Sequence, residues 1–291
     1  MSHILTLIAA RAATTLDGAT IARVRGALRG GEPAVLSPGE AVDIPVREPP
    51  DMAVVRAAIG KREIDAIAVK ARGRRKGLLI ADMDSTVITS ETLDELADFA
   101  GLKEKISAIT ARAINNELNF EEALRERVGM LKGLGVDALE KTWERVVLTG
   151  GARELVATMR AHNAMTALVS GGFTFFTARV AKMVGFHVNR ANVLLDDGAA
   201  LTGAVSEPIL GREAKVTALK ELAAERGVKM AATLAVGDGA NDLAMLAEAG
   251  LGVAFHAKPA VAAAARARVD FCDLRALLFV QGYRTDEFRN V

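Results

Sequence analysis

Apolar and polar residues alternate over the first 72 positions in a way that predicts a small mixed domain. The pattern predicts a strand, two helices and a last strand at 4–10, 17–29, 50–59 and 65–70. Five of the seven prolines lie between Pro33 and Pro50, which places turns and short edge strands between the helices. The order βαββαβ indicates an α+β domain of the split βαβ kind over 1–72.

A different pattern begins at Gly77. The apolar run at 78–81 predicts a short strand buried on both faces of a parallel sheet, and acidic residues follow it directly. No strand signal follows for a long stretch. Apolar residues at helical spacing there predict four helices, at 91–100, 103–117, 120–134 and 138–146. We therefore expect residues 88–148 to form a helical cap inserted after this strand.

Strands and helices then alternate, which predicts an α/β fold with a doubly wound parallel sheet formed by 77–87 and 149–291. Strands are predicted at 166–169, 233–236, 251–254 and 269–272, and helices at 152–162, 173–184, 213–226, 242–249 and 259–267. Two short strands near 193–196 and 201–205 flank a turn. Ligands of such sheets bind beyond the carboxyl ends of the strands, where the polar clusters of this sequence lie.

Composition narrows the classes of function. Hydrophobic residues make up 51% and charged residues 25%, and a net charge of +1 creates no overall field for nucleic acid or a membrane. The apolar run at 4–10 is too short for a membrane span and has no basic segment before it. The single cysteine, Cys272, is expected in the core, so we expect a cytoplasmic protein. A local basic run is expected to be a solvated linker: Arg72, Arg74, Arg75 and Lys76.

Two acidic residues, Asp82 and Asp84, follow the strand at 78–81. Residues at i and i+2 of an extended segment project to the same side, so both carboxylates would converge beyond the strand. Such convergence is unfavourable unless a cation or a proton relieves it. A solvated loop with two acids is the alternative, and the pair alone does not decide between the two.

A second acidic cluster follows another predicted strand and contains Asp238, Asn241 and Asp242. Asp242 could simply cap the next helix. With Asp238 and Asp82 at neighbouring strand ends, however, three or four carboxyl groups would share one crevice. Such oxygen ligands suit Mg²⁺, which keeps several waters and also binds phosphate. The four histidines are scattered along the chain, so no zinc site is expected.

Ser170 and Lys215 add a possible phosphate site. Ser170 ends a predicted strand and precedes two glycines, so its hydroxyl and the exposed N–H groups could hold phosphate. Lys215 lies near the start of a helix, and its ammonium suits a phosphate or a nucleophile. Alone, Ser170 could be a helix cap and Lys215 a surface lysine. Together with the acidic strand ends, they favour a functional site.

These residues resemble the four ordered motifs of the haloacid dehalogenase superfamily. The motifs are Asp82-Met83-Asp84-Ser85-Thr86, Ser170-Gly171-Gly172, Lys215 and Gly237-Asp238-Gly239-Ala240-Asn241-Asp242. The insertion after the first motif is similar to the small helical cap class of that superfamily. Within it, the sequence resembles the phosphoserine phosphatase family through Glu91, the segment Leu118-Asn119-Phe120-Glu121 and Arg127. By element order alone, residues 1–72 resemble the ACT-like domain found ahead of some bacterial members.

The resemblance implies Mg²⁺-dependent hydrolysis of O-phospho-L-serine to L-serine and phosphate, the last step of serine biosynthesis. Asp82 would form an aspartyl-phosphate, and Asp84 would act as acid and then as base. Asp82, Asp238 and the backbone carbonyl of Asp84 would bind Mg²⁺. The phosphate would be held by Ser170, the Gly171 N–H and Lys215. Asn241 would bind the substrate. Together with Asp242, it would also orient the metal ligands and Lys215.

The resemblance also implies that specificity comes from the cap. Glu91 would bind the substrate ammonium, and Arg127 would bind its carboxylate in bidentate fashion. Without the resemblance, the helix dipole explains Glu91 and an exposed helix face explains Arg127 equally well. Phe120 and Ile114 would form an apolar wall or serve as helical core residues.

Other functions remain as alternatives. A relative with the same core could act on phosphohomoserine, phosphoethanolamine or a nucleotide, which would not need both Glu91 and Arg127. A non-catalytic amino-acid sensor would be expected to lack the nucleophile, the second acid or the lysine, and all three are present. The sequence leaves open whether the N-terminal domain binds serine or pairs two subunits in a homodimer.

Overall fold

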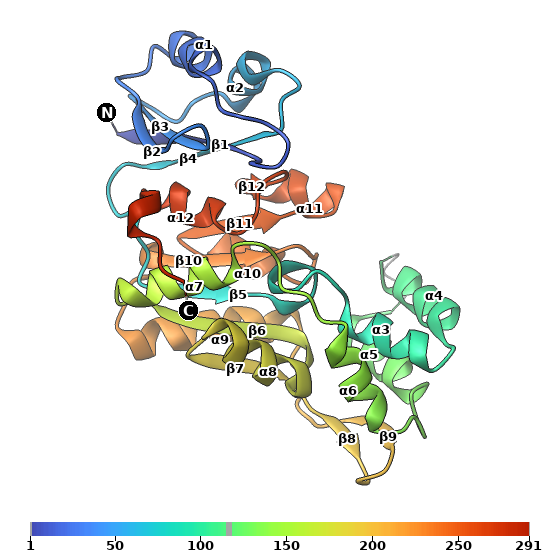
Figure 1. Ribbon diagram of the computed structural model, residues 1–291. Coiled ribbons are helices and arrows are strands. Elements are labelled where there is room, and N and C mark those ends of the chain that lie inside the picture. The colour runs from blue at the N-terminus through green and yellow to red at the C-terminus, as the bar shows by residue number, and fades with distance from the viewer. Residues whose placement is uncertain (1, 115–117, 291) are drawn as a thin grey trace.

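A computed structural model describes residues 2–114 and 118–290 of the 291-residue chain. Its N-terminal part contains β1 (His3–Ala9), α1 (Gly18–Leu28), β2 (Ala34–Ser37), β3 (Ala41–Val46), α2 (Met52–Ile59) and β4 (Ile64–Lys70). The strands form an antiparallel sheet in the order β2-β3-β1-β4. Both helices cover the outer face of this sheet, and the other face lies toward the rest of the molecule (Figure 1). The predicted βαββαβ order is confirmed.

A six-stranded parallel sheet forms the centre of the molecule. Its order is β12 (Ala267–Val269), β11 (Leu251–Phe255), β10 (Thr233–Gly237), β5 (Leu78–Ala81), β6 (Met165–Phe173) and β7 (Val188–Asn192). In this order Ala81 of β5 pairs with Val236 on one side and Leu168 on the other. The ends of three strands therefore lie at one edge of the sheet, as expected for a doubly wound α/β fold.

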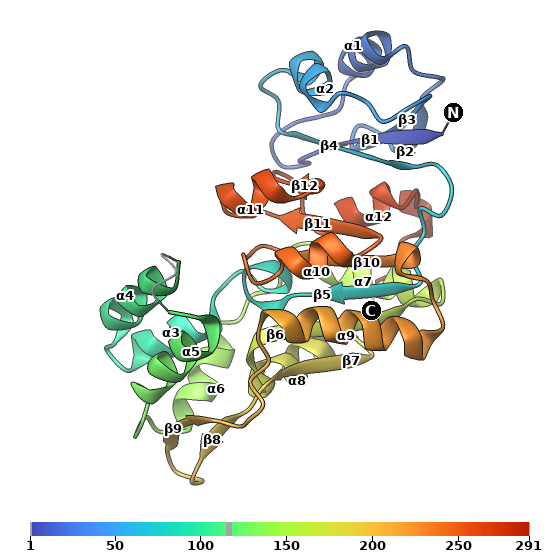
Figure 2. The same cartoon turned by 180° about the vertical axis from the view of Figure 1, so that it is seen from behind.

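Helices cover both faces of the parallel sheet (Figures 1 and 2). One face packs against α7 (Ala152–Ala161), α8 (Thr174–Val184) and α12 (Ala276–Val280). The other face packs against α9 (Arg212–Arg226), α10 (Leu243–Glu248) and α11 (Pro259–Ala264). Two single turns, η2 (Met230–Ala232) and η3 (Thr285–Glu287), complete this part. Burial on both faces explains why β5 consists of four apolar residues.

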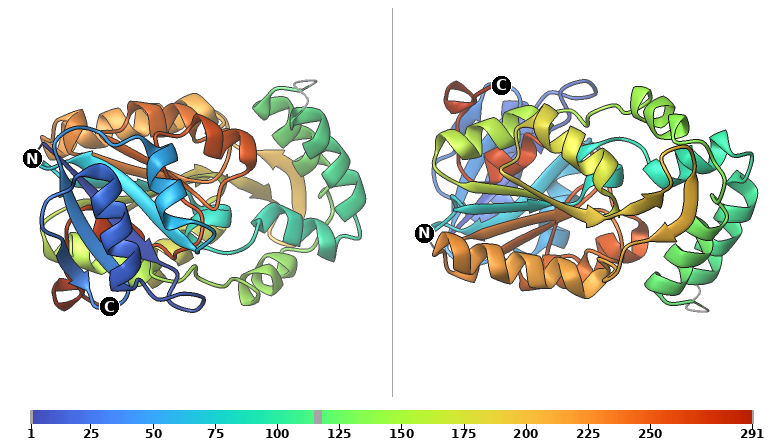
Figure 3. Two further views of the ribbon diagram at one scale, coloured as in Figure 1. Left: turned by 90° about the horizontal axis from the view of Figure 1, so that it is seen from above. Right: turned by 90° about the horizontal axis from the view of Figure 1, so that it is seen from below.

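The helical cap is inserted after β5 and a wide turn, η1 (Met83–Val87). It contains α3 (Thr92–Phe99), α4 (Lys103–Ile114), α5 (Phe120–Gly129) and α6 (Asp137–Glu144). The two connections to the sheet pair at an isolated bridge between Ile88 and Leu148. A hairpin, β8 (Leu194–Asp196) and β9 (Leu201–Val205), leaves the sheet region and packs against α5. Figure 3 shows the cap and this hairpin together at one end of the sheet.

Two elements of the fold were not predicted, and several predicted boundaries were wrong. Strand β7 was missed because it is a polar edge strand without an apolar run, and α12 was also missed. The last strand lies at Ala267–Val269 rather than 269–272, and α5 ends at Gly129 rather than at 134. Residues 115–117 of the helix predicted at 103–117 fall outside the described part, as does the side chain of Ile114.

The interpretation of the basic run as a solvated linker was wrong for Arg74, whereas Arg72 and Arg75 are exposed. Arg74 is largely buried, and its guanidinium pairs with Asp43 of β3 through bonds of 2.6 and 3.0 Å. It also donates to the carbonyl of Val280 at 3.1 Å. Cys272 is buried, as predicted. Throughout the described ranges, no helix combines the length and the apolar character that crossing a membrane requires.

Candidate active site

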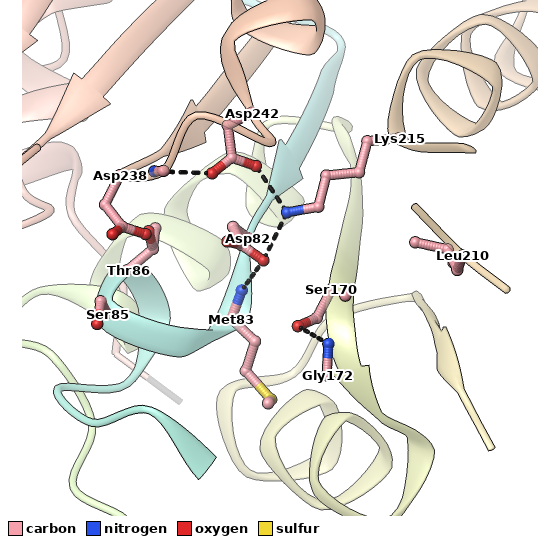
Figure 4. A network of polar contacts seen from close by, with 12 residues as sticks. Asp82, Met83, Ser85, Thr86, Ser170, Gly172, Leu210, Lys215, Asp238 and Asp242 are labelled. Carbon is pink, nitrogen blue, oxygen red and sulfur yellow. Dashed lines mark hydrogen bonds and ion pairs between the residues drawn. The ribbon is translucent and has the colours of Figure 1, made fainter. Parts of the chain in front are cut away.

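Three buried carboxylates and one buried lysine meet at the carboxyl ends of β5 and β10 (Figure 4). Oxygen atoms of Asp82, Asp238 and Asp242 all lie within 4.8 Å of one another. The Lys215 ammonium, from the first turn of α9, lies 2.8 Å from Asp82 Oδ1 and 2.6 Å from Asp242 Oδ1. The structure therefore brings together both acidic strand ends and the lysine that the sequence singled out.

Backbone geometry explains why glycines surround the second acidic cluster. A Cβ atom on Gly237 would lie 2.4 Å from Cγ of Asp242, and one on Gly239 would lie 2.2 Å from Oδ1 of Asn241. The Asp242 carboxylate turns back to accept from the Gly239 N–H at 3.1 Å and makes no cap bond to its own helix. Asp242 is therefore held against Lys215 and does not serve as a simple helix cap.

The electrostatics of the cluster reflect an excess of buried negative charge. Burial, reinforced by Asp82 and Glu91, raises the pKa of Asp238 to about 6. Burial and the charge of Asp82 likewise raise the pKa of Asp242 to about 7. For Lys215, burial alone would lower the pKa, but Asp242 and Asp82 outweigh it and raise the pKa. A single lysine leaves these carboxylates undercompensated, so this oxygen-lined cluster fits a divalent cation.

Asp84 differs from Asp82 in its surroundings. Its Oδ1 accepts from the Thr92 N–H at 3.1 Å, and its Oδ2 lies where a Cβ atom on Gly172 would approach to 2.8 Å. Burial and the charges of Glu91 and Asp82 raise the pKa of Asp84 well above its ordinary value. Asp84 therefore keeps its proton to a higher pH than an ordinary aspartic acid, which suits a proton donor.

Ser170 and the two glycines after it face the same site from β6. Ser170 is buried, and its Oγ accepts from the Gly172 N–H at 2.9 Å. The pairing of β6 with β7 shifts register between Val169 and Phe173, so the regular ladder is interrupted at these residues. The predicted strand thus continues beyond 169 but bulges where the sequence placed the phosphate site.

The cap places three further predicted residues near the core. The Phe120 ring contacts the core glycines, because a Cβ atom on Gly171 would lie 2.9 Å from its Cζ. Glu91 accepts from the Ser85 hydroxyl at 2.7 Å, and burial raises the pKa of Glu91. Burial lowers the pKa of the Arg127 guanidinium, against the opposing charges of nearby Asp94 and Glu91. Outside the cap, in the second acidic cluster, Asn241 lies half-buried beside Gly239.

Sequence reasoning gave no role to Thr86. Its hydroxyl donates to Asp238 Oδ1 at 3.2 Å and thereby joins the first acidic motif to the second. The sequence signal that could have identified Thr86 was its position in the segment Asp82–Thr86, two residues after the second acid.

The sequence profile of the haloacid dehalogenase-like hydrolases matches residues 79–247, and the chain belongs to this family. Among its relatives, the phosphoserine phosphatase of Archaeoglobus fulgidus is 43% identical over 185 residues, which cover 64% of this chain. The match spans 54% of that relative, about half of its length.

Solved structures show the same likeness. A probable phosphoserine phosphatase from Vibrio cholerae, in unliganded form, superposes with a TM-score of 0.79 and is 32% identical, covering 97% of this chain and 86% of its own. A substrate-bound phosphoserine phosphatase complex superposes with a TM-score of 0.66 at 38% identity, covering 70% of this chain and 98% of its own.

Proposed function

We propose that the protein hydrolyses O-phospho-L-serine to L-serine and phosphate through an aspartyl-phosphate on Asp82, the last step of serine biosynthesis. The observation that carries this proposal is the contrast between two nearby carboxyl groups: one lies beside a cation, and the other has a raised pKa. Asp82 lies 2.8 Å from the Lys215 ammonium, whereas the pKa of Asp84 is raised by burial and by its acidic neighbours. The names of the related phosphatases support the choice of substrate.

In the first half-reaction, an Asp82 oxygen attacks phosphorus while the bond from phosphorus to the serine oxygen breaks. Asp84 gives its proton to that departing oxygen. In the second, Asp84 takes a proton from a water molecule whose oxygen attacks phosphorus, which releases phosphate and restores Asp82. Lys215, Ser170 and the Gly171 N–H balance the charge of the phosphoryl oxygens.

Asp82, Asp238 and the backbone carbonyl of Asp84 would hold Mg²⁺, and Asn241 and Asp242 would support this shell and Lys215. When bound, the cation would supply positive charge that offsets the negative charge of the phosphate. In the cap, Glu91 would bind the substrate ammonium, and Arg127 its carboxylate. Phe120 would cover the bound phosphate from the cap side.

We further infer that residues 1–72 form an ACT-like domain, that 77–87 with 149–291 form the phosphatase core, and that 88–148 form the cap. The hairpin of β8 and β9, which lies within the core segment 149–291, packs against α5 of the cap. A single buried cysteine supports a cytoplasmic location. We include a homodimer in the proposal, with the N-terminal domain either pairing the two subunits or binding serine.

Phosphate release from L-phosphoserine in the presence of Mg²⁺ tests the function directly. Asp82→Asn should lower turnover at least about 1,000-fold because it removes the nucleophile, while its thermal unfolding stays close to that of wild type. Phosphohomoserine and phosphoethanolamine should be poorer substrates. Faster turnover of either would assign the site to that compound, and activity that survives Asp82→Asn would exclude the proposed nucleophile.

A further inference from the structure

A buried asparagine outside the recognised motifs joins two segments that border the active site. Asn192 is the last residue of β7 and is 2% exposed. Its Nδ2 donates to the carbonyl of Gly171 at 2.9 Å and to the carbonyl of Leu210 at 3.3 Å, and its Oδ1 accepts from the Leu210 N–H at 2.6 Å. Two carbonyls and one N–H therefore fix the orientation of the amide.

Each of the two bound segments leads to a group that handles the phosphate. Gly171 lies directly between Ser170 and Gly172. Leu210 precedes Gly211, which is the N-cap of α9, and the first turn of that helix carries Lys215. One side chain thus fixes the spacing between the segment that offers the hydroxyl and N–H groups and the segment that positions the ammonium.

Both segments also contact the same ring of the cap. A Cβ atom on Gly171 would lie 2.9 Å from Cζ of Phe120, and one on Gly211 would lie 3.2 Å from Cδ1 of that ring. The regular ladder between β6 and β7 is interrupted at Gly171, where the bond from Asn192 provides a side-chain anchor. Asn192 therefore connects the two glycine-containing segments that contact the Phe120 ring.

We propose that Asn192 is a positioning residue for phosphoryl transfer, which holds the Ser170–Gly172 segment and the segment before α9 at the separation the phosphoryl group requires. The inference rests on the proposed function and assigns a role to a residue that would not itself touch the substrate. Loss of these bonds would let the two segments shift, and misplacement of about 1 Å can lower turnover about 100-fold.

Asn192→Asp is the sharpest test. It keeps the size and the acceptor for the Leu210 N–H but turns an oxygen toward two carbonyls. Turnover should fall about 10- to 100-fold on both L-phosphoserine and p-nitrophenyl phosphate, because the phosphoryl group is common to both, with KM changed less than kcat. Protonation of the new acid restores a donor, so the deficit relative to wild type should shrink from about pH 8 to about pH 5. Asn192→Ala should show a deficit without this recovery.

Asn189→Ala is the matched control on the same strand. Asn189 is exposed and accepts from the Thr177 hydroxyl at 3.1 Å, so its loss should leave turnover unchanged. Binding of inorganic phosphate by calorimetry gives a readout that does not depend on hydrolysis. If wild type fails to cleave phosphoserine, the proposed function fails, but weaker phosphate binding by Asn192→Asp would still support the positioning role. Wild-type kcat and phosphate affinity in both folded Asn192 variants would overturn the inference, and so would equal losses in Asn189→Ala.

Discussion

The Asp65 carboxylate accepts a hydrogen bond from the backbone N–H of Cys272 at 2.9 Å, and it binds the N–H groups of the two preceding residues as well. Asp65 is fully buried on β4, whereas Cys272 lies in the loop after β12. That loop continues to Leu274, whose N–H donates to the carbonyl of Gly150, in the segment that leads from the cap back to the sheet. One buried carboxylate thus joins the N-terminal sheet to a loop that reaches the base of the cap.

Asp65→Asn should lower the free energy of unfolding by about 2 kcal/mol, because an amide loses the charge and offers one acceptor oxygen to three donors. Urea unfolding measures the change. Glu48→Gln, an exposed acid in the same part of the chain, should change it by less than about 0.5 kcal/mol. Equal effects of the two substitutions would mean that the loop is held without Asp65.

Arg74→Ala should lower the free energy of unfolding by about 3 kcal/mol, because it leaves the buried Asp43 carboxylate without its bidentate partner. Removing both residues should cost less than the sum of the single losses, which a double-mutant cycle by urea unfolding would show. Arg72→Ala, at an exposed position in the same linker, serves as the control. Strict additivity would contradict the pairing.

The burial of Arg74, in contrast to its exposed neighbour Arg72, could not be predicted from the sequence. A basic run looks the same in the sequence whether it is solvated or packed, and only the long-range approach of Asp43 distinguishes Arg74. The same holds for Asn192, whose partners lie 21 and 18 residues away. The strand β7, which carries Asn192, is a polar edge strand and lacks an apolar pattern.

The acidic strand ends were predictable because local patterns determine them. Strand β5 was predicted at its observed bounds, since four apolar residues before an acid indicate a strand buried on both faces. Parallel strands place their carboxyl ends at one edge, so the proximity of Asp82 and Asp238 follows from the topology. The hydrogen-bond partners of Asp84 and Glu91, Thr92 and Ser85, depend on the irregular turn from η1 into α3, which no periodic pattern specifies.

Gly237→Ala should lower phosphatase activity at least about 100-fold, because its Cβ would lie 2.4 Å from Asp242 Cγ and would displace the partner of Lys215. Turnover of L-phosphoserine measures the effect. Gly26→Ala is a contrasting control, since a Cβ there meets nothing within 4 Å on an exposed face of α1. It should keep full activity and stabilise the fold by about 0.5–1 kcal/mol. Full activity of Gly237→Ala would show that Asp242 can move without consequence.

Arg127→Ala should separate recognition of the substrate carboxylate from the chemistry at phosphorus. Turnover of L-phosphoserine (kcat/KM) should fall about 100-fold or more, because a desolvated bidentate partner is lost, while p-nitrophenyl phosphate, which lacks a carboxylate, should lose less than about threefold. The control is Arg125→Ala on the same helix. Arg125 is exposed and pairs with Glu207 at 2.8 Å, so its loss should affect neither substrate. Equal losses on both substrates would mean that Arg127 supports the cap and does not bind the carboxylate, and the substrate would then have to be sought among phosphomonoesters without that group.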